Sequence, residues 1–179
     1  PGLEFLREAN AGDRGTVGRR VVVVGGTDTA VDCARTALRL GAEPLVLCQG
    51  TRADLSASTE AFDEAIREGV RFEFQVWPVA VQTSGHAEHE EAIDAIRAMY
   101  VESEGDRPRT RLVGVECVRM RAGEPGSSGE RRALPILNSN FIIPADTLLT
   151  ALGEEPDLGF LPAEISGGTR NFKLSFTAA

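Results

Sequence analysis

Residues 19–42 read RRVVVVGGTDTAVDCARTALRLGA, and this stretch decides the fold. A run of valines, which favour strands, predicts a buried strand at Arg20–Val24. Two glycines follow, and small residues at helical spacing then predict a helix at Asp28–Leu40 that ends at Gly41. A second strand is predicted at Pro44–Cys48. A strand, a helix and a strand in this order form a βαβ unit, so the two strands should be parallel and the crossover right-handed.

The turn between the first strand and the helix carries most of the glycine fingerprint of dinucleotide-binding folds, Gly-x-Gly-x-x-Gly/Ala. Gly25 and Ala30 fit its first and sixth places, but Thr27 holds the third, where a glycine normally lets pyrophosphate approach bare backbone. The branched side chain would crowd a phosphate, and a positive φ there would add strain on the order of 1–3 kcal/mol. Alternatively, the Thr27 hydroxyl donates to a phosphate, or the turn binds no ligand at all.

Later periodicity predicts an α/β fold, a Rossmann-like parallel sheet flanked by helices with a smaller antiparallel β meander. The predicted inward face of the next helix is Phe62, Ala65 and Ile66. A turn is predicted at Ala122–Gly129. The further elements are a helix at Thr59–Glu68, strands at Arg71–Val76, Val79–Gln82, Leu112–Met120, Arg132–Leu137, Asn140–Ile143 and Thr147–Ala151, and an amphipathic helix within 92–101.

Composition narrows the class of protein. The net charge of −8 over 179 residues disfavours nucleic acid and anionic membranes as partners, and no apolar stretch approaches a membrane span. Three unevenly spaced cysteines form no CxxC pair, which favours reduced thiols and a cytoplasmic protein. Cys48, at a strand end, is the one cysteine whose reactivity we would test. His86 and His89 lie beside glutamates in a polar segment without a third His or Cys, so we interpret them as solvated and predict no metal site.

Several blocks of the chain resemble the pyridine-nucleotide domain of the glutamate synthase small-subunit family of flavoprotein oxidoreductases. The matching blocks are 25–26 with 28–30, 32–42, 114–120, 144–147 and 151–157. The resemblance implies that 1–18 connect from a flavin domain outside this sequence and that 154–179 return toward it. Residues 19–153 would form the NAD(P)-binding domain, with an insertion at 86–109 that packs on the domain or docks a partner. The start at Pro1 agrees with an excised domain.

By resemblance, the domain holds NADPH so that hydride passes to FAD on the neighbouring domain. The implied partners are that flavin domain and a larger redox subunit, and no catalytic acid or base from this chain is needed. Leu152 and Gly153 should lie near the nicotinamide or flavin end. For Asp28 two alternatives stay open: its carboxylate repels a pyrophosphate, or it caps the N-terminus of the helix. The implied cofactor-binding residues are Gly25, Gly26, Thr27, Asp28, Thr29, Ala30, Gln49, Arg52, Leu152 and Gly153.

This sequence departs from the family pattern at the end of the second strand as well as at Thr27. The family carries Tyr-Arg-Arg-Ser there, and the arginine forks suit the 2′-phosphate of NADPH. Here the run is Cys48-Gln49-Gly50-Thr51, with only Arg52 nearby. The two departures predict weak or lost NADPH binding. They leave two hypotheses, a working nucleotide domain and a degenerate one kept as a structural or partner-binding module.

Overall fold

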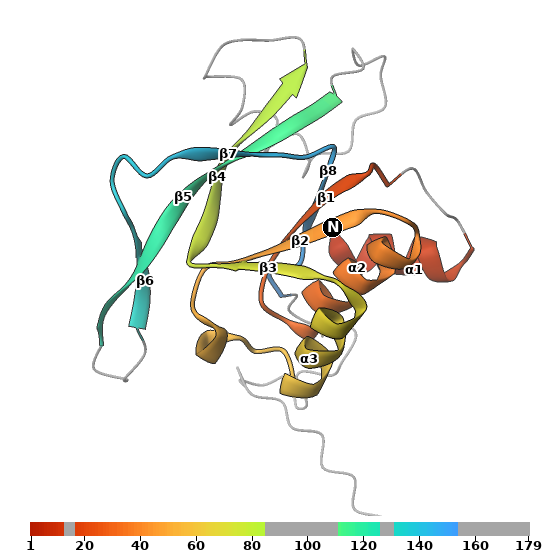
Figure 1. The fold of residues 1–179 in the computed structure, drawn as a ribbon, viewed down its shortest axis with the longest axis horizontal. Helices are drawn as coiled ribbons and strands as arrows, with labels where there is room; N and C mark the ends of the chain where they lie inside the picture. The colour runs from red at the N-terminus through yellow and green to blue at the C-terminus, as the bar shows by residue number, and fades with distance from the viewer. Residues whose placement is uncertain (13–16, 85–110, 126–130, 154–179) are drawn as a thin grey trace, which may run out of the picture.

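The computed structural model describes residues 1–12, 17–84, 111–125 and 131–153 (Figure 1). These residues form helices, a parallel sheet and an antiparallel sheet stacked as three layers. The elements are α1 (Gly2–Asn10), β1 (Arg20–Val24), α2 (Asp28–Arg39), β2 (Glu43–Cys48), the 3-10 helix η1 (Arg52–Asp54), α3 (Thr59–Glu68), β3 (Arg71–Phe74), β4 (Val76–Ser84), β5 (Arg111–Pro125), β6 (Arg131–Pro135), β7 (Phe141–Pro144) and β8 (Thr147–Thr150).

The parallel sheet has the strand order β3-β2-β1-β8, and every neighbouring pair in it is parallel. The last strand, β8, returns from the far end of the described chain to pair with β1, so that Val24 lies beside Thr150. The predicted fold, a Rossmann-like parallel sheet with a smaller antiparallel meander, is confirmed.

The four valines of β1 are buried because layers cover the sheet on both faces. Val21 and Val23 pack in the cluster formed with α2, whereas Val22 and Val24 pack in the cluster formed with the antiparallel strands. Each valine is at most 2% exposed. A continuous apolar run, instead of an alternating one, is what a strand covered on both faces requires.

The helices cover one face of the parallel sheet. The small residues that were predicted to form the inner stripe of α2, such as Ala30 and Cys33, are fully buried. At the start of α3, Ser58 is the cap, and its hydroxyl accepts a hydrogen bond from Ala61 N–H at 3.2 Å. The prediction that Ile66 faces inward is wrong, since it is 46% exposed. The buried residues of α3 are Phe62 and Ala65, which face α2 and the rings of β3, and Ile66 lies outside this narrow stripe.

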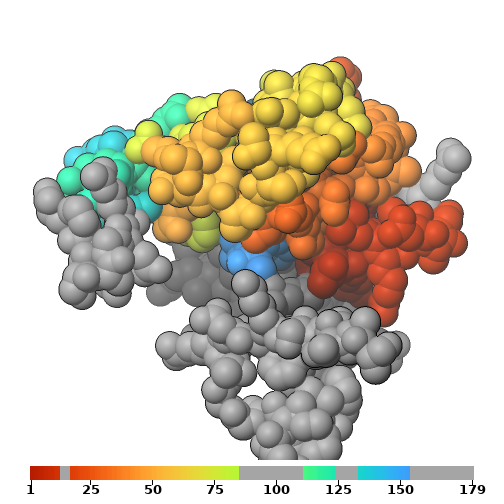
Figure 2. Space-filling model, turned by 90° about the horizontal axis from the view of Figure 1, so that it is seen from below, coloured from red at the N-terminus to blue at the C-terminus, as the bar shows by residue number. Residues whose placement is uncertain are grey.

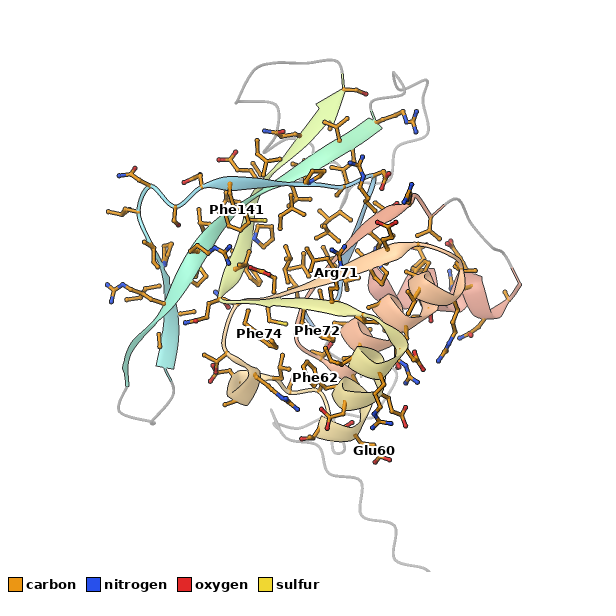
Figure 3. The ribbon with its side chains drawn as sticks, in the orientation of Figure 1. Glu60, Phe62, Arg71, Phe72, Phe74 and Phe141 are labelled. Carbon is orange, nitrogen blue, oxygen red and sulfur yellow. The ribbon has the colours of Figure 1, made fainter. Side chains whose placement is uncertain are left out.

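Three phenylalanines join α3 to that edge strand. The rings of Phe62 and Phe72 lie 4.6 Å apart between centroids, and Phe74 stacks beside Phe72 at 6.3 Å (Figure 3). Such tilted and offset aromatic pairs contribute more than their buried area alone. They fix the position of α3 at the edge of the sheet.

The antiparallel sheet begins at a sharp corner. Gln75 has φ of +56°, and this conformation ends β3 and starts β4, so the predicted continuous strand Arg71–Val76 is wrong at this residue. Its N–H donates to Gly50 O at 3.0 Å, and its carbonyl accepts from Met120 N–H at 2.7 Å. Gln75 therefore ties the segment that follows β2 to β5. Strand β5 also continues to Pro125, past the start of the predicted turn, because β6 pairs with it there.

The start of the chain forms α1, where no helix was predicted. Gly2 is buried against α2, and a Cβ added to it would lie 2.9 Å from Cys33 Sγ. The insertion at 86–109, its expected helix and the segment 154–179 lie outside the described residues. Of the helices in the described ranges, none has the length and apolar character needed to cross a membrane.

Candidate functional site

A cleft of about 620 Å³ opens at the carboxyl ends of β1 and β2. This is where parallel α/β sheets place their ligands, and the volume is in the range of small-molecule sites. One wall comes from the glycine turn, the end of β2 and η1, and the other comes from the antiparallel sheet. The lining residues are Gly25, Gly26, Thr27, Cys48, Gln49, Gly50, Thr51, Ala53, Asp54, Leu55, Ser56, Gln75, Trp77, Arg121, Ala122, Ala133 and Leu152.

The first fingerprint glycine is required by a close backbone approach. Gly25 has φ of +143°, and a Cβ added there would lie 2.2 Å from the carbonyl oxygen of Ala151. Its N–H donates to Leu47 O at 3.1 Å. No other residue type fits at this crossing of the turn with the end of β8, independently of any ligand.

Thr27 is the N-cap of α2, with φ of −96°. The positive φ that would have strained a threonine is therefore not present. Its hydroxyl accepts from Ala30 N–H at 3.3 Å and donates to Ala151 O at 3.2 Å. The alternative in which Asp28 caps α2 is therefore wrong. Its carboxylate instead accepts a hydrogen bond from Ser58 N–H at 2.9 Å, which joins the start of α2 to the start of α3.

The N-terminus of α2 retains donors for an anion. The first turn of a helix leaves its N–H groups without intrahelical partners. Thr27 satisfies one of them, Ala30 N–H. Within the part of the chain that the structure describes, the N–H groups of Asp28 and Thr29 have no hydrogen-bond partner. Two donors and the positive end of the helix dipole thus remain for a phosphate.

The residues directly after β2, Gln49, Gly50 and Thr51, are uncharged where the family pattern has arginines. Gln49 lines the cleft, while Thr51 donates to Asp54 from its N–H at 2.7 Å and from its hydroxyl at 2.6 Å. Arg52 is paired with Asp63 at 2.6 Å and lies 4.5 Å from the centre of the Phe62 ring. Its guanidinium is therefore directed to α3, and Arg52 is not part of the cleft lining.

The structure brings together part of the predicted cofactor set. Gly25, Gly26, Thr27, Gln49 and Leu152 line the cleft. Thr29 and Gly153 line a second cavity of about 480 Å³ beside α1, which Leu152 also borders. Asp28, Ala30 and Arg52 line neither cavity. Whether any of these residues binds a nucleotide stays a prediction.

The second wall of the cleft was not predicted from the sequence. Gln75, Trp77, Arg121, Ala122 and Ala133 all come from the antiparallel strands or the corner that leads into them. Strand register brings these residues to the cleft, since Arg121 pairs with Leu134 and Ala122 with Ala133. These residues belong to no local motif. The one signal in the sequence that could have indicated a ligand contact is the positive charge of Arg121.

The cysteines are buried thiols. Cys48 is 2% exposed, its thiol donates to Gly25 O at 3.5 Å, and burial raises its pKa to about 11. A neutral, covered thiol is a poor nucleophile, which argues against the reactivity considered for Cys48. Over the described ranges, no group of three His, Cys, Asp or Glu residues could hold a metal. His86 and His89 lie outside those ranges.

The βαβ unit, the glycine turn and the cleft at the switch between sheets define a Rossmann-like fold of the kind found in FAD- and NAD(P)-dependent oxidoreductases. A family match covers residues 2–171, and the chain belongs to the pyridine nucleotide-disulphide oxidoreductase family. The solved structure of Mycobacterium tuberculosis FprA in complex with NADPH shares the fold, with a TM-score of 0.59 at 12% identity over 88% of this chain and 46% of that one.

Two relatives give the family context. The NADPH-Fe(3+) oxidoreductase subunit beta of Geobacter sulfurreducens is 43% identical over 162 residues, which are 90% of this chain and 21% of the relative. The NADPH glutamate synthase small chain of Escherichia coli is 35% identical over 141 residues, 78% of this chain and 25% of the relative. The glutamate synthase small chain is thus one of several differently named relatives. The chain spans about a fifth to a quarter of these two relatives.

Proposed function

We propose that this chain is a domain that holds NADPH for hydride transfer to FAD bound by a neighbouring domain of a longer parent protein. The observation that carries this proposal is the cleft at the carboxyl ends of β1 and β2, which begins at the glycine turn. Family membership supports a pyridine nucleotide as the ligand.

The residues at the turn fit a pyrophosphate. Gly25 and Gly26 have no side chains at the mouth of the cleft. Beside the cleft lining, at the start of α2, the N–H groups of Asp28 and Thr29 have no partner within the described ranges. Gln49 and Thr51 would face the adenosine ribose, and Leu152 with Gly153 would lie toward the nicotinamide. NADPH supplies the hydride when bound, and the residues of this chain position it and exclude water.

The proposed domain organisation follows from the relatives and from the resemblance. Residues 1–18 would connect from the flavin domain, 19–153 would form the nucleotide domain, and 154–179 would return to the flavin domain. The matched segments make up only 21% and 25% of these two relatives, which agrees with a larger parent. By analogy with a relative named as a subunit, we also propose a second redox subunit as partner. The three unpaired cysteines favour a cytoplasmic location.

A degenerate domain is the second candidate function. Two observations favour it. The Thr27 hydroxyl forms hydrogen bonds to Ala30 and Ala151 within the fold, and the Arg52 guanidinium is paired with Asp63. In this alternative the domain is a structural or partner-binding module of a redox complex. The cleft and the unpaired N–H groups favour the working domain.

Calorimetric titration of the full chain with NADPH and NADH tests the proposal. We expect weak but measurable NADPH binding, with a Kd of about 0.1–1 mM, because only part of the usual phosphate contacts is present. The purified chain should show no flavin absorbance near 450 nm, because the flavin belongs to the neighbouring domain. Absence of binding of both nucleotides to the folded chain would favour the degenerate module. A stoichiometric bound FAD would refute the division between domains.

A further inference from the structure

Arg121 stands on the wall of the cleft opposite the end of β2. It lies on β5 and pairs with Leu134 of β6. Its neighbour Met120 donates to Gln75 O at 2.7 Å, and Gln75 donates to Gly50 O at 3.0 Å. Two backbone hydrogen bonds therefore connect the position beside Arg121 to Gly50, the residue after Gln49. Both walls line one cleft, and Figure 1 shows β5 and β6 running beside β4, on the other side of the corner from β3.

The charges of the cleft lining single out this arginine. Arg121 and Asp54 are the charged residues in the lining, and the Asp54 carboxylate accepts from the N–H and hydroxyl of Thr51. Asp54 would repel a phosphate placed beside it, so a phosphate would be favoured toward the opposite wall, where Arg121 lies.

Two other arginines near the cleft already form ion pairs within the fold. Arg52 is paired with Asp63, and Arg119 is paired with Glu73 at 2.6 Å and lies over the Phe141 ring. By contrast, Arg121 has no ion pair within the ranges that the structure describes, and it is exposed. With respect to the described residues, its guanidinium donors are therefore available for a ligand.

NADPH and NADH differ only by the phosphate on the adenosine ribose, which lies at the end of the second strand in folds of this class. A guanidinium matches a phosphate with paired, charge-assisted hydrogen bonds. Resting on the proposed function, we propose that Arg121 is a specificity-determining residue that recognises the 2′-phosphate from the antiparallel wall. It takes the place of arginines at the end of β2, where this chain has Gln49 and Gly50.

The experiment is a calorimetric titration of the full chain and its variants with NADPH, NADH and 2′,5′-ADP. Arg121→Gln should weaken binding of NADPH and 2′,5′-ADP by about 10-fold and leave binding of NADH unchanged. Arg121→Lys should retain part of the preference, since it keeps the charge but loses the fork. The difference should shrink as salt rises. Arg111→Gln is the matched control, because Arg111 lies on the same strand, is exposed and does not line the cleft.

Two results would overturn the inference while leaving the proposed function intact. One is Arg121→Gln binding NADPH as well as Arg111→Gln does. The other is an equal loss for NADH and NADPH, which would indicate a general role in the shape of the cleft. If the unaltered folded chain binds neither nucleotide, the proposed function itself fails, and the inference fails with it. Thermal melts of each variant verify that it is folded before titration.

Discussion

The hydroxyl of Thr27 donates a hydrogen bond to the carbonyl oxygen of Ala151 over 3.2 Å. This bond joins the glycine turn to the end of β8, across 124 residues of sequence. The same hydroxyl caps α2 through Ala30 N–H. The residue that departs from the dinucleotide fingerprint thus has a structural function of its own.

Removing that hydroxyl should destabilise the fold. Thr27→Val keeps the shape of the side chain but loses the cap and the bond to Ala151, so we expect about 1 kcal/mol less stability. Thr27→Ser keeps the hydroxyl and should stay close to the original stability. Urea denaturation of the two variants measures the difference, and equal stabilities for valine and threonine would contradict the capping role.

Gly25 should tolerate no side chain. A Cβ in Gly25→Ala would lie 2.2 Å from Ala151 O, at a φ of +143°. Backbone strain and overlap together predict a loss of about 3 kcal/mol or more in the free energy of unfolding.

The matched control for this change is Gly69→Ala. Gly69 also has a positive φ, +107°, but a Cβ there would have no atom within 4 Å. It therefore isolates the conformational cost, of about 1 kcal/mol. A chain with Gly25→Ala that is as stable as one with Gly69→Ala would show that the approach of Ala151 is not tight.

Acid should weaken the contact between α2 and α3. Arg35, whose side chain is 18% exposed, binds both carboxylate oxygens of Glu68, at 2.8 and 2.5 Å. This pairing lowers the pKa of Glu68 from 4.5 to about 2. The folded state therefore binds this proton less readily than the unfolded state, so its stabilising effect is complete above about pH 4.5 and is lost as pH falls toward 2.

Glu68→Gln should remove that component of the pH dependence. The urea midpoint of the original chain should fall more steeply between pH 4.5 and 2 than that of the variant. Glu60→Gln, on the exposed start of the same helix (Figure 3), should keep the original slope. Identical slopes for the original chain and Glu68→Gln would show that the pair does not affect stability.

The three thiols should react only when the chain unfolds. Burial raises the pKa of Cys48 and of Cys117 to about 11 and that of Cys33 to about 12. At pH 8 we expect negligible labelling by a thiol reagent in buffer and complete labelling in denaturant. Mass spectrometry after brief labelling measures the modified fraction of each cysteine. Rapid labelling of Cys48 in the folded chain would contradict this prediction and would show that Cys48 is reactive.

The sequence predicted the parallel sheet well because its signals are local. The valines of β1 and the small residues of α2 show their burial in their own spacing, and Gly41 marks the end of α2. The corner at Gln75 could not be predicted, since a glutamine at φ of +56° carries no turn signal and is held by bonds to distant strands. Burial of Gly2 against Cys33 likewise depends on the tertiary fold.

The site was predictable on one wall only. The glycine turn and Gln49 belong to a known strand–turn–helix pattern, and they line the cleft. The other wall depends on the pairing of β5 with β6, so Arg121 and Ala133 meet the cleft through register and not through a motif. Ion pairing also redirected Arg52 toward Asp63, which sequence spacing does not reveal.

The space-filling view shows antiparallel strands, in green and cyan, at the opposite side of the molecule from α1, in red (Figure 2). Between these sides, the backbone of Gln75 bonds to both Gly50 and Met120. The separation of the two walls is therefore set by main-chain geometry and does not depend on which side chains face the gap. Cleft-lining residues such as Gln49 and Arg121 should therefore be exchangeable one at a time while this main-chain spacing stays constant.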